Sequence, residues 1–258
     1  MTLTPAALGP DLGPAPHADG HDLVPDPGDL PEASRQHEAA RGVEGELGDE
    51  LEEVALAVEV SGALRGEGPG ADTVEFFIRR VDDGALTPKL FDLPVGGKLF
   101  LEQRAAGHFT LAGATDSEDL ILVGTGTGVA PYRPMLHDQS TRARFGRTII
   151  LYSDRHVRDL GYLEEFRAME DDGFRFFPTI TGDEPAEAWE GLRGRVNRFL
   201  EPETYEQLTG QPLTPERCQV FLCGNPQMVV DVQEMLSPLG FQRHRKREPG
   251  QLHMEKYW

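Results

Sequence analysis

The sequence of 258 residues lacks the features of several protein classes. It has only 2 cysteines, Cys218 and Cys223, too few for a disulfide-rich secreted scaffold or a four-cysteine iron–sulfur cluster. No apolar run of about 18 residues occurs, so no transmembrane helix is expected. The 8 histidines show no metal-ligand spacing, so no metal site is predicted. Because no basic stretch precedes an apolar core at the N-terminus, the sequence predicts no signal peptide and a cytoplasmic location.

Positive charge and aromatic side chains are both scarce in the first part of the chain. The formal net charge is −19, and 17 of the 44 acidic but only 3 of the 25 basic residues lie in residues 1–75. Nucleic acid is therefore not an expected partner, because phosphate binding needs clustered Lys and Arg. Residues 1–75 contain no Phe, Trp or Tyr, and seven prolines occur by residue 31. Such a segment cannot offset its chain entropy by burial, so we expect disorder over residues 1–50, apart from a weak helix at 33–41.

After residue 50 the composition becomes typical of β-structure. Apolar stretches separated by Gly-rich turns predict strands at residues 54–60, 74–80, 99–103 and 109–111. Short strands joined by such turns are typical of an antiparallel barrel. Residues 51–113 are therefore predicted to form part of a β-barrel.

From residue 114 onward, expected strands and helices alternate. The strands are predicted at residues 119–123, 148–152, 174–180 and 218–222, and the helices at residues 131–139, 161–170, 197–207 and 226–237. This alternation indicates a parallel sheet with helices on both faces. Residues 114–258 are therefore predicted to form a Rossmann-like α/β domain.

Two turns in this half have the chemistry of nucleotide-binding loops. The first reads Gly124-Thr125-Gly126-Thr127-Gly128-Val129-Ala130-Pro131, and its glycines permit close approach to a pyrophosphate at a helix N-terminus. The second reads Cys223-Gly224-Asn225-Pro226-Gln227-Met228, with residues that commonly start helices. Each turn alone is also explained by an ordinary strand–helix connection. Together they indicate a dinucleotide site, although the first departs from the GxGxxG order of common dehydrogenases.

These two turns and the C-terminal EKYW resemble the ferredoxin/flavodoxin–NADP reductase family, specifically its bacterial type. The stretch DGALTPKLFDLPVGG and the later RAAGHFTL resemble the end of that family's flavin-binding barrel. The resemblance covers roughly residues 74–258. It implies an enzyme, a monomer, that uses FAD to pass electrons between NADPH and a small carrier, ferredoxin or flavodoxin. A separate carrier agrees with the lack of cysteines for a built-in cluster.

The resemblance also assigns residues on the NADP(H) side. Arg155 and Arg195 are expected to clamp the 2′-phosphate, since guanidinium groups suit phosphate, although a solvated surface role is open for each. Thr127, Cys223 and Glu255 are the expected catalytic residues facing nicotinamide and flavin, but Cys223 is equally explained as a core thiol. The other expected NADP(H) contacts are Gly124, Thr125, Gly126, Gly128, Asp154, Thr181, Asn225, Pro226, Gln227 and Asp231.

On the flavin side, Gly84-Ala85-Leu86-Thr87-Pro88 matches the family's phosphate turn. We expect Thr87 to cap a short helix that Pro88 starts, which would place the FAD pyrophosphate at that N-terminus. Ile78, Arg79 and Arg80 match the strand that runs beside the cofactor. Tyr257 and Trp258 match the terminal aromatic residues that cover FAD in the bacterial type.

The sequence departs from the family pattern at two places. The Arg-x-Tyr-Ser motif that chiefly fixes FAD is replaced by residues 65–70 (RGEGPG), and Gly182 stands where the family has an arginine after Thr181. Either the lineage has lost the flavin motif, or residues 1–73 are read in a wrong frame of a GC-rich gene; we favour the second explanation. The alternative function is an NADP(H)-binding remnant without flavin or redox activity. An NAD-linked dehydrogenase is disfavoured because Arg155 next to Asp154 favours a phosphate.

Overall fold

The computed structural model describes residues 76–98, 109–137, 143–183, 185 and 188–256. The predicted disorder over residues 1–50, the helix at 33–41 and the strands at 54–60 and 99–103 lie outside these described residues. Within the described part of the chain, no helix has the length and apolar character needed to cross a membrane. The predicted barrel and its boundary at residue 113 remain predictions.

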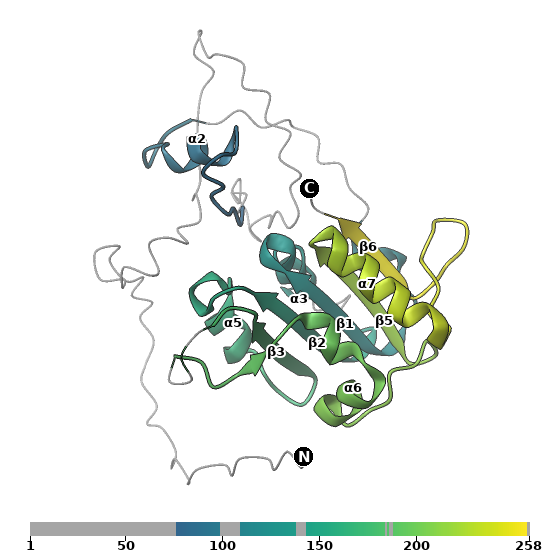
Figure 1. The fold of residues 1–258 in the computed structure, drawn as a ribbon. Coiled ribbons are helices and arrows are strands. Elements are labelled where there is room, and N and C mark those ends of the chain that lie inside the picture. Colours follow the sequence, from purple (N-terminus) through teal and green to yellow (C-terminus); the bar gives the residue numbers. More distant parts are fainter. Residues whose placement is uncertain (1–75, 99–108, 138–142, 184, 186–187, 257–258) are drawn as a thin grey trace, which may run out of the picture. The chain divides into compact units, whose positions relative to one another are not determined.

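Six parallel strands form one sheet in the order β4-β3-β2-β1-β5-β6 (Figure 1). Their bounds are β1 Ser117–Thr125, β2 Phe145–Asp154, β3 Phe174–Ile180, β4 Leu192–Arg193, β5 Cys218–Gly224 and β6 Leu252–Lys256. The chain runs outward from β1 to β4 and then crosses to β5 and β6 on the other side of β1. The direction of winding therefore reverses between β1 and β5, and ligands of such sheets bind outside the carboxyl ends of strands at this point.

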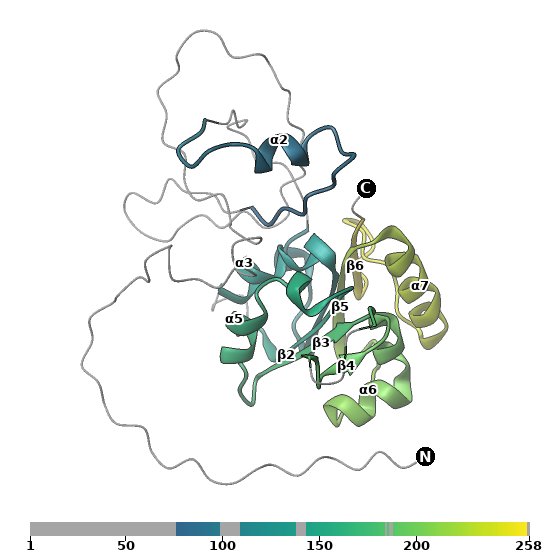
Figure 2. The ribbon, with the colours of Figure 1, turned by 60° about the vertical axis from the view of Figure 1, so that its left-hand side comes forward.

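Helices cover both faces of the sheet, as Figure 2 shows. On one face lie α3 Tyr132–His137 and α5 Leu163–Ala168, which pack against Leu120 and Leu122. On the other face lie η6 Val196–Leu200, α6 Pro202–Thr209 and α7 Pro226–Leu236, which pack against Ile121 and Val123. Successive residues of a strand point to opposite faces, so β1 supplies both cores. The Rossmann-like prediction is confirmed.

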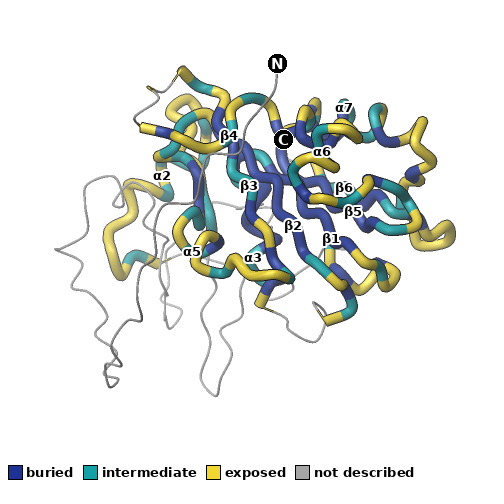
Figure 3. The backbone as a smooth tube through the Cα atoms, turned by 90° about the horizontal axis from the view of Figure 1, so that it is seen from below, coloured by how far each residue is buried: buried dark blue, intermediate teal, exposed yellow. Residues whose placement is uncertain are grey.

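Burial is greatest in the central strands, which are dark blue through the middle of Figure 3. All seven residues of β5 are buried, as expected for a parallel strand covered on both faces. The Tyr132 hydroxyl lies 2.6 Å from the Val123 carbonyl oxygen and 3.0 Å from that of Phe221. This buried side chain therefore joins β1 to β5 directly beneath the Gly-rich turn.

The predicted helix at 197–207 was wrong as a single element. Residues Val196–Leu200 form the 3₁₀ helix η6, and a separate helix, α6, begins at Pro202. Glu201 between them is extended, with ψ 130°, because the residue before proline avoids the α region. Strands β4 and β6 were not predicted from the sequence. The strand expected at 174–180 is present with those ends as β3, and the other expected elements of this domain are present with shifted ends.

Two predicted strands before the sheet were also wrong in their described parts. Residues 76–80 have no regular secondary structure. In the stretch 109–111, Leu111 instead begins the 3₁₀ helix η2, Leu111–Gly113. Leu111 is buried in the α/β core, and Phe109 contacts Phe221 with a ring-centroid distance of 5.4 Å. Packing against the sheet has replaced the strand pairing that we expected.

Short helices complete the described chain. They are α2 Thr87–Phe91, η3 Gly126–Val129, η4 Val157–Asp159 and η7 Ser237–Leu239. Helix α2 has only five residues, and none of them is buried. Helix η3 directly follows β1, so the Gly-rich turn lies at the reversal point of the sheet.

Candidate nucleotide-binding site

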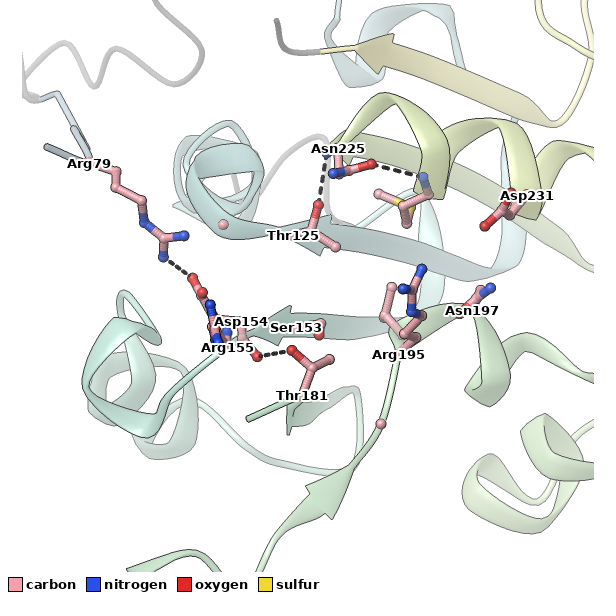
Figure 4. A pocket seen from close by; sticks show the side chains of 14 residues that line it. Arg79, Thr125, Ser153, Asp154, Arg155, Thr181, Arg195, Asn197, Asn225 and Asp231 are labelled. Carbon is pink, nitrogen blue, oxygen red and sulfur yellow. Dashed lines mark hydrogen bonds and ion pairs between the residues drawn. The ribbon is translucent and has the colours of Figure 1, made fainter. Parts of the chain in front are cut away.

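A cavity of about 650 Å³ lies at the carboxyl ends of the strands (Figure 4). Its walls come from the loops after β1, β3 and β5, the end of β2, and the segment that leads into η6. Nine residues predicted from the sequence line it: Arg79, Thr125, Gly126, Asp154, Arg155, Thr181, Arg195, Asn225 and Asp231. The structure thus gathers residues from positions 79 to 231 at the place where parallel sheets bind ligands.

The Gly-rich turn supplies the cavity wall next to β1. Gly126 has φ +56°, a left-handed conformation that glycine adopts without steric cost. A Cβ atom placed there would have only the Arg79 guanidinium nearby, at 3.7 Å, so the turn is open toward the cavity. The Thr125 hydroxyl accepts a hydrogen bond of 2.9 Å from the Asn225 backbone N–H. This bond ties the turn after β1 to the turn after β5.

Gly128 and Gly224 serve the packing between these two turns and do not line the cavity. A Cβ atom on Gly128 would lie 2.3 Å from the Cys223 carbonyl oxygen. Gly224 has φ +126°, and a Cβ atom there would lie 2.4 Å from the Thr125 hydroxyl oxygen. Any larger side chain at either position would therefore force the turns apart.

Helix α7 directs its N-terminus toward the cavity. The Asn225 side-chain oxygen accepts hydrogen bonds from the backbone N–H groups of Gln227 at 2.8 Å and Met228 at 3.3 Å, and Pro226 occupies the first turn. Asn225 is thus an N-cap residue, a role that stabilises the start of a helix. The N-terminus of this eleven-residue helix has the dipole orientation that favours an anion.

Two exposed arginines give the cavity a positive wall. Arg155 directly follows β2, and Arg195 directly precedes η6; Figure 4 shows them on separate backbone segments. Gly194 has φ +116°, and its backbone bonds β3 through the Ile180 carbonyl at 2.8 Å and the Thr179 hydroxyl at 2.9 Å. These bonds fix the chain just before Arg195. Two guanidinium groups held in this way suit a phosphate group.

Gly182 cannot carry a third arginine in this conformation. Its backbone N–H donates to the Arg155 carbonyl oxygen at 2.7 Å, and a Cβ atom at Gly182 would lie 2.5 Å from that oxygen. The absence of the arginine that the resemblance places after Thr181 is therefore built into the backbone packing. The positive wall depends on Arg155 and Arg195.

Asp154 is the one acidic side chain at the end of β2 among the cavity residues, and it is almost fully buried, with 3% of its side chain exposed. One carboxylate oxygen accepts the Arg155 backbone N–H at 2.6 Å, and the other forms an ion pair with Arg79. Burial raises the pKa of Asp154, and Arg79 opposes that rise. Burial acts to lower the pKa of Arg79, but the charge of Asp154 outweighs it and raises that pKa. Asp154 and Arg79 thus form an ion pair at the edge of the cavity.

The three predicted catalytic residues lie close together but do not line this cavity. Cys223 of β5 and Glu255 of β6 are register partners on adjacent strands, and Cys223 is completely buried. Thr127 lies in η3, next to Gly128, whose backbone packs on Cys223. The three residues therefore occupy the β5–β6 side of the sheet's carboxyl edge, and their roles remain predictions.

The flavin-side assignments change in detail. Leu86, not Thr87, is the N-cap position of α2, so the predicted cap was wrong. The Thr87 hydroxyl instead accepts the Val81 backbone N–H at 2.8 Å, which closes the turn before the helix. Arg80 forms ion pairs with Asp82 and Asp92, and Arg79 reaches the cavity through Asp154.

Other predicted residues do not line the cavity, or lie outside the residues that the structure describes. The Gln227 side-chain amide donates to Asp231 at 2.7 Å, Pro226 is the first residue of α7, and Gly124 lies near the end of β1. Ile78, Ala85, Leu86 and Pro88 belong to the segment before β1, where Ala85 is exposed and the others are half-buried. Tyr257 and Trp258 lie outside the described residues, and the flavin-side roles remain predictions.

Five cavity residues were missed by the sequence reasoning: Ser153, Gly194, Val196, Asn197 and Met228. Four of them flank predicted residues, since Ser153 precedes Asp154 and the other three surround Arg195. Their position next to predicted residues in the sequence was the signal that could have identified them. Met228 was part of the second motif but was given no role there.

Comparison with known proteins agrees with this geometry. A family model described as Oxidoreductase NAD-binding domain matches residues 122–234. The chain is 33% identical over 193 residues to a flavodoxin/ferredoxin–NADP reductase of Shigella flexneri, covering 74% of this chain and 77% of the relative. It is 32% identical over 196 residues to ferredoxin–NADP reductase A of Sorangium cellulosum, covering 72% and 69%.

A solved structure gives the same assignment. The chain resembles a ferredoxin NADP⁺ reductase from Neisseria gonorrhoeae, crystallised with bound FAD and NADP, with a TM-score of 0.69 and 30% identity. The match covers 77% of this chain and 78% of that one. With the parallel sheet, the two glycine turns and the arginine-lined cavity, these similarities show that the chain belongs to the flavodoxin/ferredoxin–NADP reductase family.

Proposed function

We propose that this chain is an FAD-dependent oxidoreductase that passes electrons between NADPH and a small electron carrier, ferredoxin or flavodoxin. The observation that carries the proposal is the cavity at the carboxyl edge of the sheet, where Arg155 and Arg195 face the open turn at Gly126. Membership of the reductase family supports the same reaction.

The cavity residues fit NADP(H) by their chemistry. Arg155 and Arg195 would hold the 2′-phosphate, and the N-terminus of α7 with the turn at Gly126 would meet the pyrophosphate. Thr181 and Asp231 would border the ribose. This chain's part in the reaction is to bind and orient the nucleotide and to limit its contact with water.

The flavin would lie on the side of the exposed turn Ala85–Pro88, with Tyr257 and Trp258 covering it. FAD supplies the redox chemistry of this family, because it takes a hydride from NADPH and releases single electrons. Thr127, Cys223 and Glu255 would lie where the two cofactors meet. A monomeric, cytoplasmic protein is part of this proposal and rests on the sequence alone.

The test uses the full chain with added FAD. After desalting, we expect a yellow protein that oxidises NADPH when an artificial electron acceptor is present, and that uses NADH much less well. A colourless protein that still binds NADPH would support the nucleotide-binding remnant instead. A protein that binds neither nucleotide would overturn the assignment of the cavity.

A further inference from the structure

The end of β2 carries two recognition elements with opposite preferences. Asp154 is the last residue of β2 and lines the cavity, the place where an acidic side chain of a nucleotide-binding sheet commonly accepts a ribose 2′-hydroxyl. Arg155 follows immediately and favours a 2′-phosphate. An unpaired carboxylate beside that phosphate would repel it, so the state of Asp154 bears directly on which nucleotide binds.

Both carboxylate oxygens of Asp154 are engaged. Oδ1 accepts the Arg155 backbone N–H at 2.6 Å, and Oδ2 pairs with the Arg79 guanidinium. Arg79 comes from 75 residues earlier in the chain, and 44% of its side chain is exposed at the cavity. Figure 4 shows Arg79 extending to Asp154 from outside the sheet. In this arrangement the carboxylate has a positive partner and its oxygens already accept hydrogen bonds.

We propose that Arg79 is a positioning residue for cofactor selection, which neutralises Asp154 and so lets Arg155 and Arg195 select the 2′-phosphate. The inference rests on the proposed function, namely that the cavity binds NADP(H). Arg79 acts through Asp154 and does not itself need to touch the nucleotide. It makes the preference for NADP(H) depend on a residue outside the two glycine motifs.

The direction of the effect follows from charge. When Arg79 is replaced by a neutral residue, Asp154 loses its positive partner, and to the extent that its carboxylate is ionised it repels a phosphate placed beside Arg155. The same carboxylate becomes able to accept a hydrogen bond from a 2′-hydroxyl. Nucleotides with a 2′-phosphate should then lose affinity, whereas nucleotides with a free 2′-hydroxyl should not.

The experiment measures binding of two small probes, 2′,5′-ADP and 5′-AMP, by isothermal titration calorimetry with the full chain. These probes differ only in the 2′-phosphate and require neither flavin nor turnover. In the Arg79→Gln variant we expect 2′,5′-ADP to bind about tenfold or more weakly, and 5′-AMP to change less than about twofold. Arg175→Gln, which removes an exposed arginine of β3 away from the cavity, is the matched control.

The double variant Arg79→Gln/Asp154→Asn tests whether Arg79 affects nucleotide affinity through Asp154. Removing the unpaired carboxylate should restore 2′,5′-ADP affinity to within about threefold of the unmodified chain. A structural role of Arg79 would not be repaired in this way. The single variant Asp154→Asn should keep the preference for 2′,5′-ADP, which leaves the proposal testable if Arg79→Gln folds poorly.

The outcomes separate the two proposals. If the unmodified chain prefers 2′,5′-ADP but Arg79→Gln weakens both probes equally or neither, the role of Arg79 is wrong and the NADP(H) site stands. Failure of the double variant Arg79→Gln/Asp154→Asn to regain 2′,5′-ADP affinity overturns the role as well. If the unmodified chain shows no preference for 2′,5′-ADP, the proposed function fails, and the inference fails with it.

Discussion

The two ends of the same sheet each bury an aspartate beside arginine, but the surroundings differ. Asp119, near the start of β1, has a fully buried side chain, and Arg147 contacts both of its carboxylate oxygens at 3.0 Å. Arg217 adds a third contact at 3.1 Å. Asp154, at the carboxyl edge, has one arginine partner, and that partner is half-exposed at a cavity.

The amino-terminal edge is closed by its own hydrogen bonds. Arg147 also donates to the Thr209 carbonyl at the end of α6 at 2.8 Å, and Arg217 pairs with Glu118. The cluster thus joins β1, β2, α6 and the chain entering β5. Its charges are satisfied within the protein, so this cluster stabilises the fold and has no capacity left for a ligand.

The carboxyl edge is different because the chain leaves each strand there through a loop. These loops bring Arg155 and Arg195 to the cavity as exposed side chains, and α7 points its N-terminus the same way. Similar ionic chemistry therefore serves stability at one edge and recognition at the other. What decides the role is whether the arginine's hydrogen bonds are completed inside the protein.

The largest expected effect is on the closed edge. Replacing Asp119 with asparagine leaves the partly buried Arg147 without its charge partner and Arg217 with Glu118 alone, and should lower the free energy of unfolding by about 3–5 kcal/mol. Urea denaturation measures this change. Affinity for NADP⁺ should stay within about twofold under conditions where the variant is folded. A stability loss below about 1 kcal/mol, or a large loss of affinity, would contradict the contrast between the edges.

A smaller effect, on nucleotide binding and not on stability, is expected at the carboxyl edge of the sheet. Arg195→Gln should weaken NADP⁺ binding about 10- to 100-fold, equivalent to ~1.4–2.8 kcal/mol, because a charged hydrogen bond to the 2′-phosphate is lost. The free energy of unfolding should change by less than about 0.5 kcal/mol, since the side chain is exposed. Calorimetric titration and urea denaturation measure the two quantities.

The matched control for this prediction is Arg198→Gln. Arg198 lies in η6, the 3₁₀ helix that directly follows Arg195. It is exposed and does not line the cavity. The variant Arg198→Gln removes one positive charge from the neighbourhood of the cavity, as Arg195→Gln does. Equal losses of affinity in the two variants would mean that Arg195 acts only through the general positive field.

The smallest expected effect concerns the core between the two edges. His253 of β6 stacks on Phe221 at a centroid distance of 4.1 Å and on His244 at 4.3 Å. Burial, with a smaller contribution from His244, lowers the pKa of His253 from 6.5 to about 4. In the unfolded chain this histidine therefore binds a proton at a higher pH than it does in the folded protein. The free energy of unfolding has its full value above about pH 6.5 and falls as the pH approaches 4.

Between pH 7 and pH 5.5 this loss should reach about 1 kcal/mol. The variant His253→Phe keeps an aromatic ring but has no titrating group, so its unfolding free energy should depend less on pH by that amount. Parallel pH profiles for the unmodified chain and His253→Phe would show that this histidine is not held neutral by the core.

Much of the parallel sheet was predictable from local pattern. The apolar stretches at 119–123 and 218–222 lie inside β1 and β5, because a strand covered on both faces needs continuous apolar residues. The turn beginning at Gly124 was predictable because its left-handed and closely packed positions require glycine. Asn225 and Pro226 likewise marked the start of α7, since capping is a local interaction.

Other elements carried too little local signal. β4 has only two residues, Leu192 and Arg193, which is too short for an alternating pattern, and it exists because β3 offers an unpaired edge. In β6, polar residues such as His253 and Glu255 hid a strand that pairing with β5 stabilises. The stretch at 109–111 had strand composition, but burial of Leu111 and Phe109 against the sheet decided its conformation.

The sequence by itself determined the glycine turns and the positions of the main strands along the chain, because these depend on residues close together in the chain, and the family resemblance added the arginines at 155 and 195. Only the tertiary structure decided that Arg79 pairs with Asp154, that the Asn225 backbone N–H donates to the Thr125 hydroxyl, and that Gly182 packs on the Arg155 carbonyl and leaves no space for an arginine. Each of these contacts joins segments 27 to 100 residues apart. The path of the folded chain brings such segments together, and no local preference specifies their contact.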